Sequence, residues 1–144
     1  MFDTLIGTHH SFAALVLRLV LGIIFVAHGY PKLFKKEFGP KGFSAFLKNI
    51  GIPLPIFFAY VVGISEFVGG LLLILGLWTR LGAFLIACIM IVAMWKVKFK
   101  TGLFAKTMEG GWVGGYELDL ALFAIAIALT VAGGGVFSLD QLLK

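Results

Sequence analysis

Two ionisable side chains of opposite sign stand inside long apolar segments. Arg18 interrupts the segment 12–30, and Glu66 interrupts the segment 55–78. A charge inside a membrane-spanning helix costs about 2.5–3.5 kcal/mol, so such residues normally face other helices and find partners. Two antiparallel helices joined by the first connection have neighbouring ends there. At about 1.5 Å per residue, both side chains lie about 17–18 Å from those ends along the helix axes. We therefore expect an Arg18–Glu66 ion pair near the middle of the membrane.

This pair has two interpretations. As a structural ion pair, it sets the register of two helices. As a functional pair, it lines a polar pocket for a small ligand or relays protons. The residues alone leave both open.

A second polar group is expected at one end of the protein. His28 lies near the end of the first segment, and Glu117 and Asp119 begin the segment 116–133, all within about 5 Å of one level. A histidine beside two carboxylates can accept and release protons near neutral pH. The alternative is a set of headgroup-level residues that bond to loops. Three ligands of two residue types are weak grounds for a metal, so we predict none.

The composition identifies the solvent around this chain. Of its 144 residues, 60% are hydrophobic and 13% are charged, against about 25% charged in soluble domains. The mean hydropathy is +1.06. A domain this small cannot hide so much apolar surface from water. This excludes an ordinary soluble domain, a disordered chain and a disulfide scaffold, and makes the lipid bilayer the expected partner.

The charge and the cysteine count argue against nucleic-acid binding and against cysteine-based sites. The formal net charge is +5, but the lysines lie between apolar segments, as in the loops of membrane proteins, so nucleic acid is not an expected partner. The single cysteine, Cys88, cannot form an internal disulfide, a CxxC redox pair or a cysteine-based zinc site.

Four apolar segments have lengths near those of spanning helices. An amphipathic stretch, 41–50, is expected to form a short helix in the interface plane or a re-entrant lid. No sheet is expected, because an open sheet edge cannot survive in hydrocarbon. The sequence thus predicts an all-α, integral membrane four-helix bundle, one domain over 1–144, with helices at about 12–30, 55–78, 80–97 and 116–133.

Small residues mark the helix faces expected to pack. Each face carries an ionisable residue, which places these groups inside the bundle rather than toward lipid. The three stripes are Arg18, Gly22, Phe25 and Gly29; Gly63, Glu66 and Gly70; and Glu117, Ala121, Ala124, Ala128 and Ala132.

The distribution of basic residues predicts the orientation. The first and third connections hold nine lysines, whereas the opposite side holds only Arg80 and Lys144. Basic loops face the cytoplasm. We expect a multi-pass protein of the bacterial plasma (inner) membrane, with both termini outside and the long loops cytoplasmic.

Three stretches of the chain resemble the DoxX family, and the resemblance covers nearly its whole length. The first runs from Leu17-Arg18-Leu19 to His28-Gly29-Tyr30-Pro31-Lys32. The second runs from Glu66-Phe67-Val68-Gly69-Gly70 to Trp78-Thr79-Arg80. The third holds Glu117-Leu118-Asp119 and Ser138-Leu139-Asp140. The resemblance implies four membrane helices and marks Gly29, Lys32, Gly70, Arg80 and Asp140 as motif positions.

The resemblance also implies contact with the quinone pool or with oxidative stress. The family is similar to the membrane subunit of an archaeal thiosulfate:quinone oxidoreductase, and other members look like partners of secreted oxidant-defence enzymes. The chain has no haem, flavin or iron–sulfur motif. If electrons move, a quinone or a partner subunit must carry them.

Three functions follow as hypotheses. The first is a redox-associated subunit, a quinone-linked oxidoreductase component, that binds a quinone or a similar small apolar ligand beside Arg18 and Glu66, with His28, Glu117 and Asp119 exchanging protons and no covalently bound cofactor. The second is a non-enzymatic scaffold for a partner redox enzyme. The third is a small transporter, which would need to form a homo-oligomer.

Overall fold

The fold is built on three long apolar helices. The computed structural model describes residues 10–108 and 111–143. Within them, α2 (His10–Phe34), α4 (Pro55–Leu75) and α5 (Thr79–Ala93), the last continued by a π-helical turn, η1 (Met94–Lys98), supply helices long and apolar enough to cross a membrane. The expected all-α membrane protein is confirmed.

The fourth expected helix is shorter. α6 (Glu117–Ala132) has 16 residues, a length of about 24 Å, against a hydrocarbon core of about 30 Å. It packs along α5, and the short helix α7 (Leu139–Leu142) follows it. The four expected segments are therefore helical, but only three of them meet the length of a span.

The first helix is longer than expected. The first helix was expected at about 12–30, but α2 continues through Pro31 to Phe34. Proline removes one backbone donor and usually breaks a helix interior. Here one further turn follows, with the Lys35 N–H donating to the Pro31 carbonyl at 3.4 Å. That extra turn decides where the side chain of Lys32 lies.

The amphipathic helix of the first connection is α3 (Gly39–Asn49), close to its expected bounds. Its apolar face packs on the first turns of α4, where Phe43 and Leu47 are buried with Ala59. α3 is therefore attached to the bundle by a small apolar core of its own.

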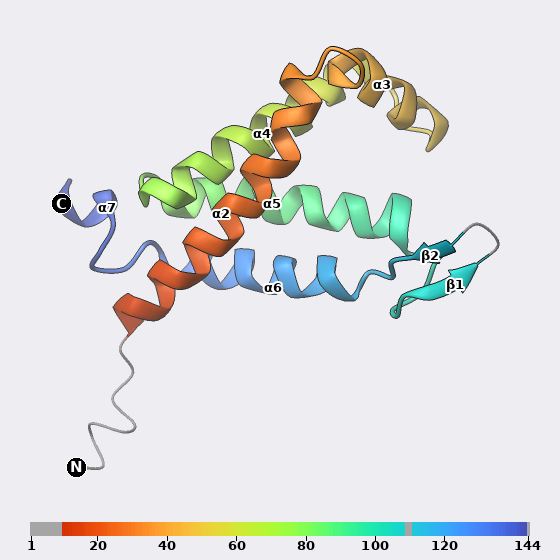
Figure 1. The fold of residues 1–144 in the computed structure, drawn as a ribbon. Coiled ribbons are helices and arrows are strands. Elements are labelled where there is room, and N and C mark those ends of the chain that lie inside the picture. The colour runs from red at the N-terminus through yellow and green to blue at the C-terminus, as the bar shows by residue number, and fades with distance from the viewer. Residues whose placement is uncertain (1–9, 109–110, 144) are drawn as a thin grey trace.

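The expectation of no sheet is wrong in one place. Two short antiparallel strands, β1 (Lys106–Met108) and β2 (Gly111–Val113), form a hairpin in the third connection, with Lys106 opposite Val113. The hairpin lies between α5 and α6, beyond the spanning helices (Figure 1). The hydrocarbon argument against sheet edges does not apply to a connection outside the spans.

α2 and α4 cross at their glycines, as the stripes predict. A Cβ at Gly22 would lie 2.7 Å from the Gly70 carbonyl oxygen, and one at Gly70 would lie 2.7 Å from that of Gly22. A Cβ at Gly29 would lie 2.5 Å from the Phe67 nitrogen. The two backbones touch at these points, which only glycine permits.

The alanine stripe predicted for α6 does not face the bundle. Ala121, Ala124 and Ala128 are exposed, whereas Leu122, Ala126 and Leu129 are buried against α5 and the core. In lipid, helices associate by packing, and Leu122, Ala126 and Leu129 fill the space between α5 and α6 while Ala121, Ala124 and Ala128 line the outer surface.

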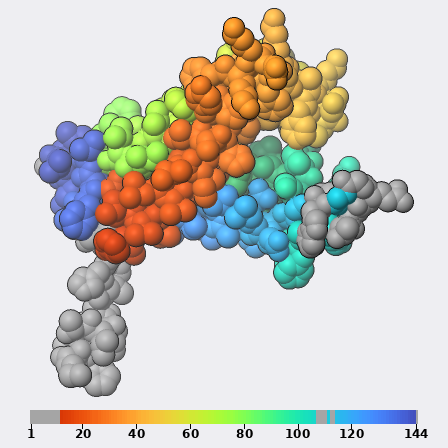
Figure 2. Space-filling model, viewed as in Figure 1, coloured from red at the N-terminus to blue at the C-terminus, as the bar shows by residue number. Residues whose placement is uncertain are grey.

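The bundle has two distinct ends (Figure 1). At the α3 end, α2 finishes and α4 begins. At the α7 end, α2 begins, α4 turns into α5, and α6 finishes. Figure 2 shows the C-terminal segment that contains α7 lying beside α2 and α4. Outward-facing apolar side chains between the ends are exposed, among them Ile23 (60%) and Phe84 (52%), as expected of a lipid-facing surface.

We expect Gly70→Ala to destabilise the protein by about 1–3 kcal/mol, because the new methyl group must displace the α2 backbone. Gly69→Ala is the matched control on the same helix, since its Cβ would meet the nearest atom, the Gly82 carbonyl oxygen, at 3.4 Å. Thermal unfolding in detergent measures both. Equal melting temperatures for the two variants would contradict the backbone contact.

Candidate functional site

Glu66 is buried in the middle of α4 and forms an ion pair with Lys32 of α2. The Lys32 Nζ donates to Oε1 at 2.6 Å and to Oε2 at 2.5 Å. The side chain of Glu66 is 4% exposed and that of Lys32 is 16% exposed. A buried carboxylate needs such a partner because removing an ion from water costs several kcal/mol.

Phe43 contacts this pair, and His28 lies one helical turn away from it. The Lys32 ammonium lies 4.8 Å from the ring centroid of Phe43, so α3 contributes a cation–π contact. His28 is exposed. His28 precedes Lys32 by one helical turn, which places both on the same face of α2. The site therefore comprises Lys32, Glu66, His28 and Phe43.

The expected Arg18–Glu66 pair is not formed, and Arg18 is not near the middle of the membrane. The expected depths of Arg18 and Glu66 in the membrane assumed that the end of α2 lies at the same level as the start of α4. Instead, Gly29 lies beside Phe67 and Gly22 beside Gly70. The helices are staggered, so Arg18 lies beside the last turn of α4, at the α7 end, and Glu66 lies nearer Lys32.

Arg18 caps the C-terminal end of α4. Its guanidinium donates to the carbonyl oxygens of Ile74 at 3.1 Å and Leu73 at 3.3 Å, and also to that of Phe137. The residue is 2% exposed. The last carbonyls of a helix have no partner within it and carry partial negative charge, so a buried cation stabilises them. Arg18 is a structural residue of the turn that follows α4.

Asp140 caps the N-terminal end of α5. Its carboxylate accepts from the backbone N–H of Trp78 at 2.6 Å and of Thr79 at 2.9 Å. Trp78 has φ of 45°, a conformation that costs about 1–3 kcal/mol outside glycine. Burial alone raises the pKa of Asp140, but hydrogen bonds from Thr79 and Trp78 and the charge of Arg18 hold it below its usual value of 3.8.

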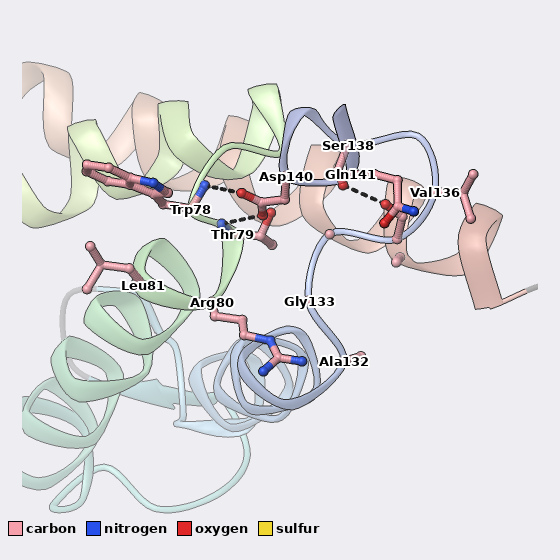
Figure 3. Close-up of a pocket in the computed structure, with 13 residues that line it drawn as sticks. Trp78, Thr79, Arg80, Leu81, Ala132, Gly133, Val136, Ser138, Asp140 and Gln141 are labelled. Atoms are coloured by element: carbon pink, nitrogen blue, oxygen red, sulfur yellow. Dashed lines mark hydrogen bonds between the residues drawn. The ribbon is translucent and has the colours of Figure 1, made fainter. Parts of the chain in front are cut away.

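A cavity of about 680 Å³ adjoins this turn (Figure 3). It lies between the start of α5, the end of α6 and the segment 133–141, with Ala14 of α2 at its edge. Its polar lining includes Thr79, Arg80, Ser138 and Asp140. The motif positions Arg80 and Asp140 therefore meet here, whereas Lys32, Gly29 and Gly70 lie along the α2–α4 contact.

The expected cluster of His28, Glu117 and Asp119 is not joined by any hydrogen bond or ion pair among the described residues. Glu117 is exposed and Asp119 is partly exposed in the first turn of α6, where carboxylates stabilise the helix dipole. Over residues 10–108 and 111–143 no three His, Cys, Asp or Glu side chains are grouped to hold a metal ion.

The role of Lys32 as the partner of Glu66 was not predicted from the sequence. A signal was available, because Lys32 falls one turn after His28 if α2 continues through Pro31. The role of Asp140 as a helix cap carried no local signal. It depends on a contact across 61 and 62 positions of the chain.

A double-mutant test separates the ion pair from its surroundings. We expect Lys32→Met to cost about 3–5 kcal/mol, because it leaves a buried carboxylate unpaired, and Lys32→Met/Glu66→Met to recover most of that loss. Chemical unfolding in micelles measures the variants. A double variant as unstable as the single one would argue against the pair.

The pH dependence of stability tests Asp140. Since its pKa is lower in the folded protein, the carboxylate stabilises the fold above its unfolded pKa, and this contribution is lost as pH falls through the folded value. We expect the difference in melting temperature between the wild type and Asp140→Asn to narrow as pH falls from about 5 to about 3. A constant difference would remove the carboxylate from this role.

Comparison with known proteins assigns the chain. Residues 13–99 match the DoxX family. The chain is 36% identical over 126 residues to "Putative oxidoreductase CatD" of Bacillus subtilis, covering 88% of this chain and 83% of the relative. It is 33% identical over 138 residues to "Uncharacterized membrane protein Rv3486" of Mycobacterium tuberculosis, covering 92% and 82%.

An uncharacterized Haemophilus influenzae protein is 32% identical over 127 residues, covering 87% of this chain and 86% of the relative. No solved structure matches the chain significantly. The family match spans more than half of the chain, and the relatives cover most of its length. This all-α membrane protein therefore belongs to the DoxX family.

Proposed function

We propose that this chain is the membrane subunit of a quinone-linked redox system and that it holds the head of a quinone beside His28 and the Lys32–Glu66 pair. The oxidoreductase name of the Bacillus subtilis relative supports the reaction class. The observation that carries the proposal is an exposed histidine, His28, one helical turn before Lys32 of a buried ion pair within spanning helices. Ionisable residues at such depth usually serve function.

Burial along α2 indicates how a ligand reaches this site. Phe25 is 2% exposed, whereas His28, one turn further along the same face, is exposed. The packing that covers this face therefore ends between the two residues. Toward the α3 and hairpin side, the ribbons of α2 and α4 diverge from those of α5 and α6 (Figure 1). Because His28 is exposed, a ligand dissolved in lipid can contact it without unfolding a helix.

The donors present fit the head of a quinone. A quinone offers two carbonyl oxygens as acceptors, and His28 and Lys32 offer N–H donors one turn apart. When bound, the quinone supplies two-electron, two-proton redox chemistry. His28 would hold a carbonyl oxygen of the quinone through its N–H. Lys32 holds the Glu66 carboxylate through two short hydrogen bonds.

This proposal moves the quinone away from Arg18, whose donors serve the end of α4. The electrons then come from a partner redox enzyme, because the chain itself carries one cysteine and no dinucleotide loop. Glu117 and Asp119, at the start of α6, remain candidates for proton exchange with water, since neither is buried.

We place the protein in the bacterial plasma membrane with the α3 end facing the cytoplasm and both termini outside. α3 and the hairpin belong to the two connections that carry most of the lysines, which supports this orientation by the positive-inside rule. Protons for a quinone at His28 would then come from the cytoplasmic side. The lysines concerned are Lys32, Lys35, Lys36, Lys41, Lys48, Lys96, Lys98, Lys100 and Lys106.

Binding of decylubiquinone to the purified protein in nanodiscs tests the proposal. We expect His28→Ala to weaken binding about tenfold, the effect of losing one hydrogen bond to a charged donor. Lys36→Gln, on an exposed lysine beyond the end of α2, is the matched control and should bind as the wild type does. Equal affinity for wild type and His28→Ala would reject His28 as a quinone ligand.

A further inference from the structure

The cavity at the α7 end is separate from the proposed quinone site. It is lined from the first turn of α5, the last turn of α6 and the segment that leads into α7, whereas Lys32 and Glu66 lie along the α2–α4 contact. At about 680 Å³ its volume is within the range of small-molecule sites. Its position at the helix ends, beside the exposed Trp78, is typical of a membrane–water interface.

The charges around this cavity leave one cation available. Asp140 is held by two backbone N–H groups and by the charge of Arg18, so its own charge is compensated. Arg80 is exposed and forms no ion pair within the part of the chain that the structure describes. Figure 3 shows its guanidinium directed toward the end of α6 at Ala132 and Gly133. A helix end offers only partial charge, and five guanidinium donors exceed what it can use.

The cavity wall also contains a polar atom without a partner. Thr79 is 0% exposed, and its Oγ1 has no hydrogen-bond partner in residues 10–108 and 111–143. Such a group costs about 1–3 kcal/mol unless something satisfies it. Apolar side chains, Ala14, Leu81 and Val136, supply the rest of the lining. The combination of one free cation, one unmet hydroxyl and apolar walls fits an anion carried on an apolar body.

We infer that this cavity binds the phosphoryl group of an anionic phospholipid, with Arg80 as its charged ligand. The phosphate oxygens accept hydrogen bonds from the Arg80 guanidinium in the geometry that arginine favours. The acyl chains leave along the apolar lining toward Leu81 and the surrounding lipid. Free phosphate shares this chemistry but gains nothing from the apolar walls.

Fluorescence quenching at Trp78 tests this inference independently of quinone binding. In a Trp95→Phe/Trp112→Phe background, Trp78 is the only tryptophan left. Brominated phosphatidylglycerol and brominated phosphatidylcholine are titrated into the protein in micelles. We expect Trp78 to favour the anionic lipid about fivefold, the effect of one basic side chain near an anionic headgroup.

Four variants test whether the preference for the anionic lipid arises at this cavity. Arg80→Gln should abolish it, and Arg80→Lys should restore part of it. Val136→Phe, which fills the cavity and keeps the charge, should reduce quenching by both lipids. Lys36→Gln removes the same charge at the α3 end and should keep the full preference. Melting temperatures confirm that each variant is folded.

The outcomes decide the proposal. If inorganic phosphate at millimolar concentration displaces the brominated lipid, the phosphoryl group itself is the determinant; if it does not, the lipid is the specific source. Either result, together with the loss in Arg80→Gln, supports the site. Equal quenching by the two lipids in the wild-type background, or an unchanged preference in Arg80→Gln, overturns it. Neither result depends on His28.

Discussion

The turn between α4 and α5 depends on two side chains that belong to other parts of the chain. Where two helices meet in a tight turn, the carbonyls of the first and the N–H groups of the second lose their partners. In an apolar environment water does not replace those partners. Arg18 donates to the carbonyls, and Asp140 accepts from the N–H groups. The start of α2, the α4–α5 turn and the α7 segment are thereby fixed to one another.

This arrangement explains why the turn tolerates an unfavourable conformation. Trp78 adopts a left-handed backbone conformation in which its N–H points at the Asp140 carboxylate. Gly76, also left-handed, lies against the Arg18 guanidinium, and a Cβ there would collide with it. The strain and the missing side chain are therefore consequences of placing one cation and one anion around the same turn.

Farther along α4, the buried charge of Glu66 is compensated by an ion pair. Glu66 is surrounded by spanning helices, and Lys32 reaches it because α2 continues one turn past Pro31. Between the two ends, the glycines of α2 and α4 bring the helix backbones into contact and fix the stagger that separates Arg18 from Glu66. Charge compensation at both places thus rests on one close-packed helix crossing.

The membrane environment, the helical segments and the burial of Arg18 and Glu66 could be predicted from the amino-acid sequence, because composition, hydropathy and the cost of an unpaired charge are local properties. Which charges meet depends instead on how the helices pack. Partner choice depends on the stagger of α2 and α4, which is set by where their glycines touch, and on the passage of α2 through Pro31. Likewise, the inward face of α6, with Leu122, Ala126 and Leu129, is selected by packing between helices, which no single segment encodes.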